Sequence, residues 1–161
     1  MRNLSETNLH PQSSNTFEPK NDGKDHVNIY SRGKTNLGKA LSNFAHYVFS
    51  FEGITYQSIE GALYCYRTGN TKLIKLYGSE AKKIGSKSNE KRIESPELLK
   101  AWLYAKIFSN PELIALLLNN RLPFSHYYIM FGRKIDAGIE LPDLWREITD
   151  ELRYIYKQVN I

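Results

Sequence analysis

The residue whose type and position best suit catalysis is Glu60, two positions after Ser58. Ser58 can cap a helix that runs to about Arg67, and Glu60 then lies in its first turn among mostly apolar neighbours. The positive end of the helix dipole favours the ionised carboxylate, whereas burial against aromatic rings would raise its pKa. Because first-turn glutamates more often stabilise helices than act on substrates, composition alone favours the structural interpretation of Glu60.

Tyrosines offer a second kind of chemistry, the stacking of aromatic rings on nucleobases. The chain has 11 tyrosines, and two of them, Tyr64 and Tyr66, follow Glu60 closely. Tyr127 and Tyr128 form another pair. Aromatic faces interleaved with basic residues can hold single-stranded nucleic acid. Tyrosines in a helical domain are more often boundary residues with a buried ring and a hydrated hydroxyl, so this interpretation also has a structural alternative.

Charge is concentrated in the middle of the chain. The formal net charge is +5, and residues 32–134 hold sixteen Lys or Arg against seven Asp or Glu. Such a basic field favours phosphate-bearing partners, such as nucleotides, nucleic acids or phosphorylated metabolites. The alternative is that many of these lysines only solubilise helix surfaces.

Several classes of site are not indicated. Gly33 and Gly38 lie in a basic loop, but their spacing matches neither a P-loop nor a Rossmann fingerprint. The histidines do not pair with one another or with Cys65 at metal-ligand spacing, and no nucleophile elbow surrounds a serine. A single cysteine and the lack of a long apolar run favour a cytoplasmic protein without a membrane segment. We therefore expect no metal, no redox cofactor and no membrane partner.

The elements that must position these residues are predicted to be mainly helical. Residues 1–27 are polar and are expected to form a disordered, dispensable tail, and residues 28–161 a single compact domain. Aromatic and β-branched residues between Tyr47 and Tyr56 predict one small hairpin that turns at Glu52 and Gly53. No alternation of strand and helix suggests a parallel sheet. The predicted fold class is mainly α with a minor β-hairpin.

Helices are expected in most of the remaining chain. Ser95, Pro96 and Glu97 together form a helix start, and that helix should end near Asn110. The other expected helices cover residues 58–67, 71–77, 79–84, 111–118 and 142–159. The last of these carries apolar residues at three- and four-residue spacing, which is typical of an amphipathic helix.

Motifs spread over residues 29–118 resemble the NADAR (YbiA-like) family. The similarity includes Tyr30 to Gly33, Leu41 to Phe44, Ser58 with Glu60, Ala81 to Gly85, Ala105 with Lys106, and Asn110 to Leu113. The resemblance implies a compact, mainly helical fold with N-glycosidase activity. It implies as substrates ADP-ribose conjugates, including ADP-ribosylated nucleobases or nucleic acid, or phosphorylated ribosylaminopyrimidines of riboflavin synthesis.

The resemblance also implies that Glu60 is the catalytic residue. We predict that its carboxylate stabilises an oxocarbenium-like ribose and guides water to C1′. Asp136 is a weaker candidate for a second carboxylate, because it can act only if the fold brings it close. Arg32 and Lys83 are predicted to bind phosphate, the first as a bidentate fork and the second as a point charge.

The remaining candidate residues would bind the sugar and the base. Asn43 is expected to hold ribose hydroxyls or the leaving base, and Tyr56 or Tyr64 to stack on a ring. The matched motifs add three further candidate substrate-binding residues: Gly33, Ser42 and Phe44.

Two other functions remain open at this stage. A noncatalytic nucleotide or nucleic-acid binding module would use the basic middle of the chain and its tyrosines. A small accessory protein would bind a partner through the final helix. The sequence does not predict an oligomeric state.

Overall fold

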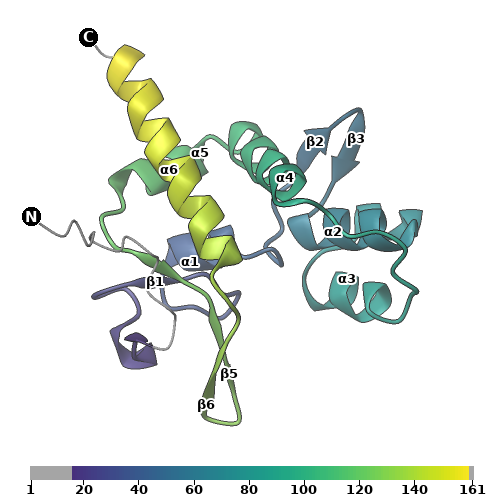
Figure 1. Cartoon of the computed structure of the whole chain (residues 1–161), viewed down its shortest axis with the longest axis horizontal. Coiled ribbons are helices and arrows are strands. Elements are labelled where there is room, and N and C mark those ends of the chain that lie inside the picture. Colours follow the sequence, from purple (N-terminus) through teal and green to yellow (C-terminus); the bar gives the residue numbers. More distant parts are fainter. Residues whose placement is uncertain (1–15, 160–161) are drawn as a thin grey trace, which may run out of the picture.

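The computed structural model describes residues 16–159 and contains helices and short strands (Figure 1). The α-helices are α1 (Asn36–Leu41), α2 (Ile59–Thr68), α3 (Gly78–Gly85), α4 (Pro96–Ser109), α5 (Glu112–Asn119) and α6 (Glu140–Val159). The strands are β1 (Val27–Asn28), β2 (Phe49–Phe51), β3 (Ile54–Tyr56), β4 (Phe124–Ser125), β5 (Tyr127–Met130) and β6 (Arg133–Asp136). Two 3-10 helices are η2 (Pro19–Asn21) and η3 (Thr71–Lys75). None of the described helices is long and apolar enough to cross a membrane.

The prediction of a mainly α fold is wrong, because the described residues form a mixed α/β structure with three two-stranded sheets. β2 and β3 form the hairpin that the sequence predicts. β5 and β6 form a second antiparallel hairpin, and β1 pairs with β4 in parallel. Because β1 and β4 lie far apart in the sequence and have two residues each, no local pattern reveals their pairing.

The β5–β6 hairpin projects away from the helices (Figure 1) and has an unusual turn. Its turn residues, Phe131 and Gly132, have φ angles of 51° and 73°. Turns that need two positive φ angles usually carry Asn-Gly or Asp-Gly, so an aromatic residue in the first position hides the hairpin from sequence analysis. The Phe131 side chain is 98% exposed.

Most helices begin where the sequence predicts, and two do not. The hydroxyls of Ser58 and Ser95 each accept a hydrogen bond from a backbone N–H of the helix that they cap. α1 falls in a segment expected to be a loop, where the Thr35 hydroxyl provides the cap. α6 begins at Glu140, ahead of the expected start at Pro142, since a proline is tolerated in the first turn of a helix.

One apolar core holds these elements together. Its largest fully buried side chains include Trp145 of α6, Phe49 of β2, and Leu103 and Ile107 of α4. Each such side chain contributes about 1.5–3 kcal/mol through burial. α4 contacts α2, α5, α6 and β2, so it is the element around which the site-bearing segments are assembled.

The segment before β1 packs against the rest of the structure. Phe17 is buried and stacks on the His26 ring with centroids 4.6 Å apart. Nε2 of His26 lies 2.7 Å from the Tyr127 hydroxyl oxygen at the start of β5. Residues 16–26 thus contact the base of the β5–β6 hairpin, while residues 1–15 lie outside the described part of the chain. The tail and the domain boundary inferred from the sequence stay predictions.

Candidate active site

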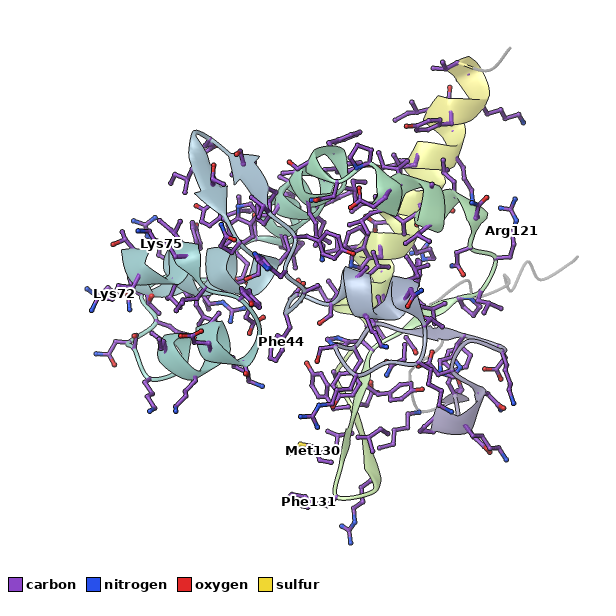
Figure 2. All side chains as sticks on the ribbon, turned by 180° about the vertical axis from the view of Figure 1, so that it is seen from behind. Phe44, Lys72, Lys75, Arg121, Met130 and Phe131 are labelled. Carbon is purple, nitrogen blue, oxygen red and sulfur yellow. The ribbon has the colours of Figure 1, made fainter. Side chains whose placement is uncertain are left out.

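An open cleft of about 1200 Å³ lies between α3 and the β5–β6 hairpin. The loop before α1, α1 itself and the segment that follows α1 also border it. Figure 2 shows Phe44 extending toward the space between the α2–α3 region and the hairpin, with Met130 and Phe131 at the hairpin tip. The lining includes Arg32, Lys39, Phe44, Tyr77, Lys82 and Tyr128.

Glu60 lies beside this cleft, in the first turn of α2, and is only 8% exposed. Burial raises the pKa of its carboxyl to about 7, although the positive charges of Lys82 and Arg67 oppose the shift. Burial also raises the pKa of Tyr128, and the charge of Glu60 raises it further. Because Lys82 and Tyr128 both line the cleft and both interact with Glu60, the carboxyl is electrostatically coupled to the cleft although it is not part of its lining.

The start of α2 is tightly fixed. The Ser58 hydroxyl accepts a hydrogen bond from the Gly61 N–H at 2.9 Å and donates one to the Leu76 carbonyl at 3.0 Å. A Cβ atom on Gly61 would lie 2.6 Å from the Leu73 carbonyl oxygen, so only glycine permits this approach of α2 to η3. The Glu60 N–H donates to the Asn43 carbonyl at 2.9 Å. Both ends of the Ser-x-Glu motif are therefore held by backbone contacts.

A carboxyl with a pKa near neutrality can act as an acid or as a base, because both of its protonation states are populated at neutral pH. Strong pKa shifts of this kind concentrate at functional sites. Burial beside cations is thus the electrostatic feature that distinguishes Glu60 from an ordinary first-turn glutamate.

The lysine of α3 that interacts with Glu60 and lines the cleft is Lys82, whereas Lys83 is the lysine predicted from the sequence to bind phosphate. The Lys82 Nζ atom lies 5.8 Å from the centre of the Phe44 ring and 6.0 Å from that of Tyr128. Lys83 is exposed on α3 and is not part of the cleft lining. Ser79 and Lys82 both line the cleft. Residues three positions apart lie on the same face of a helix, so this spacing is the sequence feature that could have indicated Lys82. Arg32 lies in the lining, and its phosphate-binding role stays a prediction.

The segment Ser42 to Phe44 connects α1 to the neighbourhood of Glu60. Ser42 is buried, and its hydroxyl accepts a hydrogen bond from the Phe44 N–H at 3.2 Å. The Asn43 side-chain oxygen is buried and has no hydrogen-bond partner among the described residues. A buried polar atom without a partner is costly, but Asn43 is not part of the cleft lining, so its predicted contact with the substrate stays a prediction.

Of the two candidate stacking tyrosines, only Tyr64 lies near Glu60. Burial raises the pKa of Tyr64, and the charge of Glu60 is the next largest cause. Tyr56 is buried against Phe49, with ring centres 5.4 Å apart, and lines a second cavity that does not include the cleft residues.

Gly33 forms a turn in which its N–H donates to the Tyr30 carbonyl at 2.9 Å.

Asp136, the second candidate carboxylate, lies at the end of β6. Its side-chain oxygen accepts a hydrogen bond from the Gly138 N–H at 3.1 Å. Burial lowers the pKa of His126 to about 4, and the charge of Asp136 opposes this shift. The structure therefore groups Asp136 with His126 at the base of the hairpin and not with the cleft lining. Its catalytic role stays a prediction.

Part of the cleft lining is not predictable from the sequence. His46 and Tyr77 stack with ring centres 4.0 Å apart and an interplanar angle of 3°, and both line the cleft. They come from segments far apart in the chain, so only the fold brings them together. The position of Tyr128 beside Glu60 likewise depends on the fold. Among the described residues, no group of three or more His, Cys, Asp or Glu could hold a metal ion.

Comparison with solved structures finds a protein of similar fold. The chain is similar to the NMR structure of the E. coli protein YbiA, with a TM-score of 0.63 and 19% sequence identity. The match covers 82% of this chain and 87% of YbiA. No protein-family model and no curated protein matches the sequence. The similarity to YbiA therefore establishes a shared fold over most of both chains.

Proposed function

We propose that the protein is an N-glycosidase that hydrolyses the bond between ribose C1′ and a nitrogen atom in a phosphorylated substrate. The observation that carries this proposal is the buried Glu60 carboxyl, with a pKa of about 7, beside a cleft lined by cations. The YbiA-like fold and the resemblance to NADAR motifs around Glu60 support it.

Glu60 would act on the water that replaces the base. As the C1′–N bond lengthens, positive charge develops on the ribose, and a nearby carboxylate stabilises it. The ionised form of Glu60 accepts a proton from water as the water oxygen bonds to C1′. The electron pair of the broken bond leaves with the nitrogen, which is then protonated. A pKa near 7 suits this proton transfer at neutral pH.

The cleft cations would hold phosphate. Arg32 can form two parallel hydrogen bonds to phosphate oxygens, and Lys82 supplies a point charge between phosphate and Glu60. Asn43 would use its unpaired side-chain oxygen to accept a hydrogen bond from a ribose hydroxyl. Phe44 and Tyr128 provide aromatic faces for a ring.

The size of the cleft favours an ADP-ribose conjugate over a phosphorylated ribosylaminopyrimidine. Its volume of about 1200 Å³ lies above the usual range for drug-sized ligands, roughly 300–1,000 Å³. A ligand with two phosphates, two riboses and a base would use several of the separated lining groups together.

A substrate panel tests this proposal. The full chain would be incubated with an ADP-ribosylated nucleobase, an ADP-ribosylated oligonucleotide and a phosphorylated ribosylaminopyrimidine, and the products identified by mass spectrometry. We expect free ADP-ribose from the first two, with the incoming ¹⁸O of labelled water on C1′. Intact substrates in all three reactions, with folded protein, would contradict the proposed activity.

A noncatalytic nucleic-acid binding module is a second candidate. The exposed Phe131 at the tip of the hairpin favours it, because an exposed aromatic ring next to basic residues can stack on a base. Figure 2 places two further cations, Lys72 and Lys75, on the α2–α3 region away from the hairpin. Binding of unmodified oligonucleotides that weakens steeply with salt, without any product release, would favour this function over hydrolysis.

A further inference from the structure

A buried lysine supports the segment between α1 and β2. Lys106 of α4 is 1% exposed, and its Nζ atom donates a hydrogen bond to the Ser42 carbonyl at 3.1 Å. The same atom lies 5.3 Å from the centre of the Tyr47 ring and 5.9 Å from that of Trp145. Burying an amine without a carboxylate partner is costly, so its place in the core calls for a specific reason.

The segment that Lys106 contacts joins three helices. The Asn43 carbonyl accepts a hydrogen bond from the Glu60 N–H of α2 at 2.9 Å, and the Phe44 carbonyl accepts one from the Gly78 N–H of α3 at 3.0 Å. At its far end, the side chain of Asn110, next to α4, donates to the Val48 carbonyl at 3.0 Å. Residues 42–48 thus form a backbone bridge between the helix that carries Glu60 and the helix that carries Lys82.

We propose that Lys106 is a positioning residue that fixes this bridge, and through it the placement of Glu60 relative to the cleft. The Ser42 carbonyl also accepts the Ala45 N–H at 3.1 Å, closing a turn, and the amine of Lys106 holds that turn against α4. A displacement of about 1 Å at a reacting group can lower a rate by as much as two orders of magnitude. The effect of Lys106 on turnover rests on the proposed N-glycosidase function, whereas its effect on the bridge does not.

Replacement of Lys106 tests the proposal directly. Lys106→Met keeps an unbranched apolar stem of similar length and removes the hydrogen-bond donor. We expect hydrogen exchange at the Ala45, Glu60 and Gly78 amides to become faster by on the order of tenfold, which is the effect expected for the loss of one buried hydrogen bond. kcat should fall by on the order of tenfold or more with little change in KM, because the bridge positions Glu60 without touching substrate.

Leu99→Ala is the matched control. Leu99 is buried on the same helix, two turns before Lys106, and its truncation lowers stability without removing a polar contact to the bridge. We expect this variant to melt at a lower temperature while exchange at the three amides and kcat stay at wild-type values. Equal effects of Leu99→Ala and Lys106→Met would mean that Lys106 acts only through general stability and would overturn the proposal.

The exchange measurement separates this proposal from the proposed activity. If the wild-type protein cleaves none of the substrates, the N-glycosidase function fails, yet faster exchange at the three amides in Lys106→Met still supports the bridge. If the wild-type protein cleaves and Lys106→Met exchanges and cleaves like wild type, the activity stands and the positioning role is wrong.

The wild-type protein provides a second test that needs no variant. Burial lowers the pKa of Lys106 to about 7, and the titratable group that faces the amine is Tyr47, whose own pKa is raised by burial and then by Glu112. Opening the bridge would hydrate the amine, so opening takes up a proton above pH 7. Exchange protection of the Ala45 and Glu60 amides, corrected for intrinsic rates, should therefore rise from pH 7 to 9, by at most about tenfold per unit. Protection that does not vary with pH would overturn the coupling.

Discussion

The two sides of α2 face different surroundings. One side carries Glu60, which interacts with Lys82 and Tyr128 of the cleft. The other side contributes Cys65 and Tyr66 to a smaller cavity of about 360 Å³. One helix of ten residues therefore carries both a carboxyl that is electrostatically coupled to the cleft and side chains that line an aromatic cavity.

The two sides differ in the polarity of their buried groups. Beside the cleft, Glu60 is buried with a raised pKa and the Asn43 side-chain oxygen has no partner among the described residues. In the smaller cavity, Tyr66 packs edge-on against Trp102 with ring centres 5.9 Å apart, an arrangement that aromatic pairs prefer. The buried titratable carboxyl on one side and the satisfied aromatic packing on the other are the reason we propose a functional role for the first and expect a structural role for the second.

The largest expected effect follows Glu60→Gln. The change keeps the size of the side chain and removes its charge and its ability to take a proton from water. We expect kcat to fall by on the order of a hundredfold or more, measured by single-turnover hydrolysis. Glu80→Gln is the control, since Glu80 is also a first-turn glutamate but is exposed on α3, and it should keep the wild-type rate.

The pH dependence of stability shows whether Glu60 is a buried carboxyl with a raised pKa or an ordinary helix-stabilising charge. The pKa of Glu60 is raised to about 7 in the folded state, so the folded protein binds more protons than the unfolded chain between about pH 4.5 and 7. Stability should fall as pH rises through this window, and Glu60→Gln should remove that loss. A variant less stable than wild type at pH 8 would instead indicate a favourable helix-dipole charge, worth about 0.3–1 kcal/mol.

Neighbouring lysines on α3 allow a second comparison. Lys82 lines the cleft and Lys83 does not, so Lys82→Met should raise KM by about tenfold while Lys83→Met should leave it nearly unchanged. Steady-state kinetics of both variants with the same substrate provides the test. A larger KM defect for Lys83→Met would restore the sequence-based choice.

The residues that sequence analysis placed correctly have local signals. The cap at Ser58 and the turn at Glu52 and Gly53 follow from rules that act within a few residues, and the structure has both. The first-turn position of Glu60 follows from the same cap. Its burial does not, because the residues that cover it come from other segments.

The features that were missed depend on long-range packing. The stack of His46 on Tyr77 and the pairing of β1 with β4 have no local pattern. The sequence also does not show that Lys82 and not Lys83 lines the cleft, since the direction of a helix face is set by what it packs against; the phosphate-binding role of Lys83 stays a prediction. The mixed α/β class was missed for the same reason, together with the uncommon turn at Phe131.

Deletions test the importance of the segment before β1. The sequence predicts that removing residues 1–26 changes little, whereas the burial of Phe17 and His26 against Tyr127 predicts a loss of stability. We expect the chain lacking residues 1–15 to melt like wild type, and the chain lacking 1–26 to lose about 3 kcal/mol or more, as for truncation of a buried aromatic residue. Equal melting of both by calorimetry would support the sequence-based view.

The aromatic side of α2 should give the smallest effect on activity. Tyr66→Leu removes the edge-on contact with Trp102 and should cost about 0.5–1.5 kcal/mol of stability, seen in urea unfolding. Turnover should remain within about twofold of wild type at a temperature where the variant is folded. A large loss of kcat would mean that the two sides of α2 are functionally coupled.

The most direct test of the account is the titration of the Glu60 carboxyl itself. ¹³C NMR of glutamate-labelled protein, with Glu60→Gln to assign the resonance, gives its pKa, and the pH profile of kcat/KM shows whether the same group controls hydrolysis. We expect a pKa of about 7 and a rate that rises with pH through the same midpoint, because the ionised form activates water. A Glu60 pKa near the ordinary value of about 4.5, or a rate that does not follow it, would contradict the central role of this buried carboxyl.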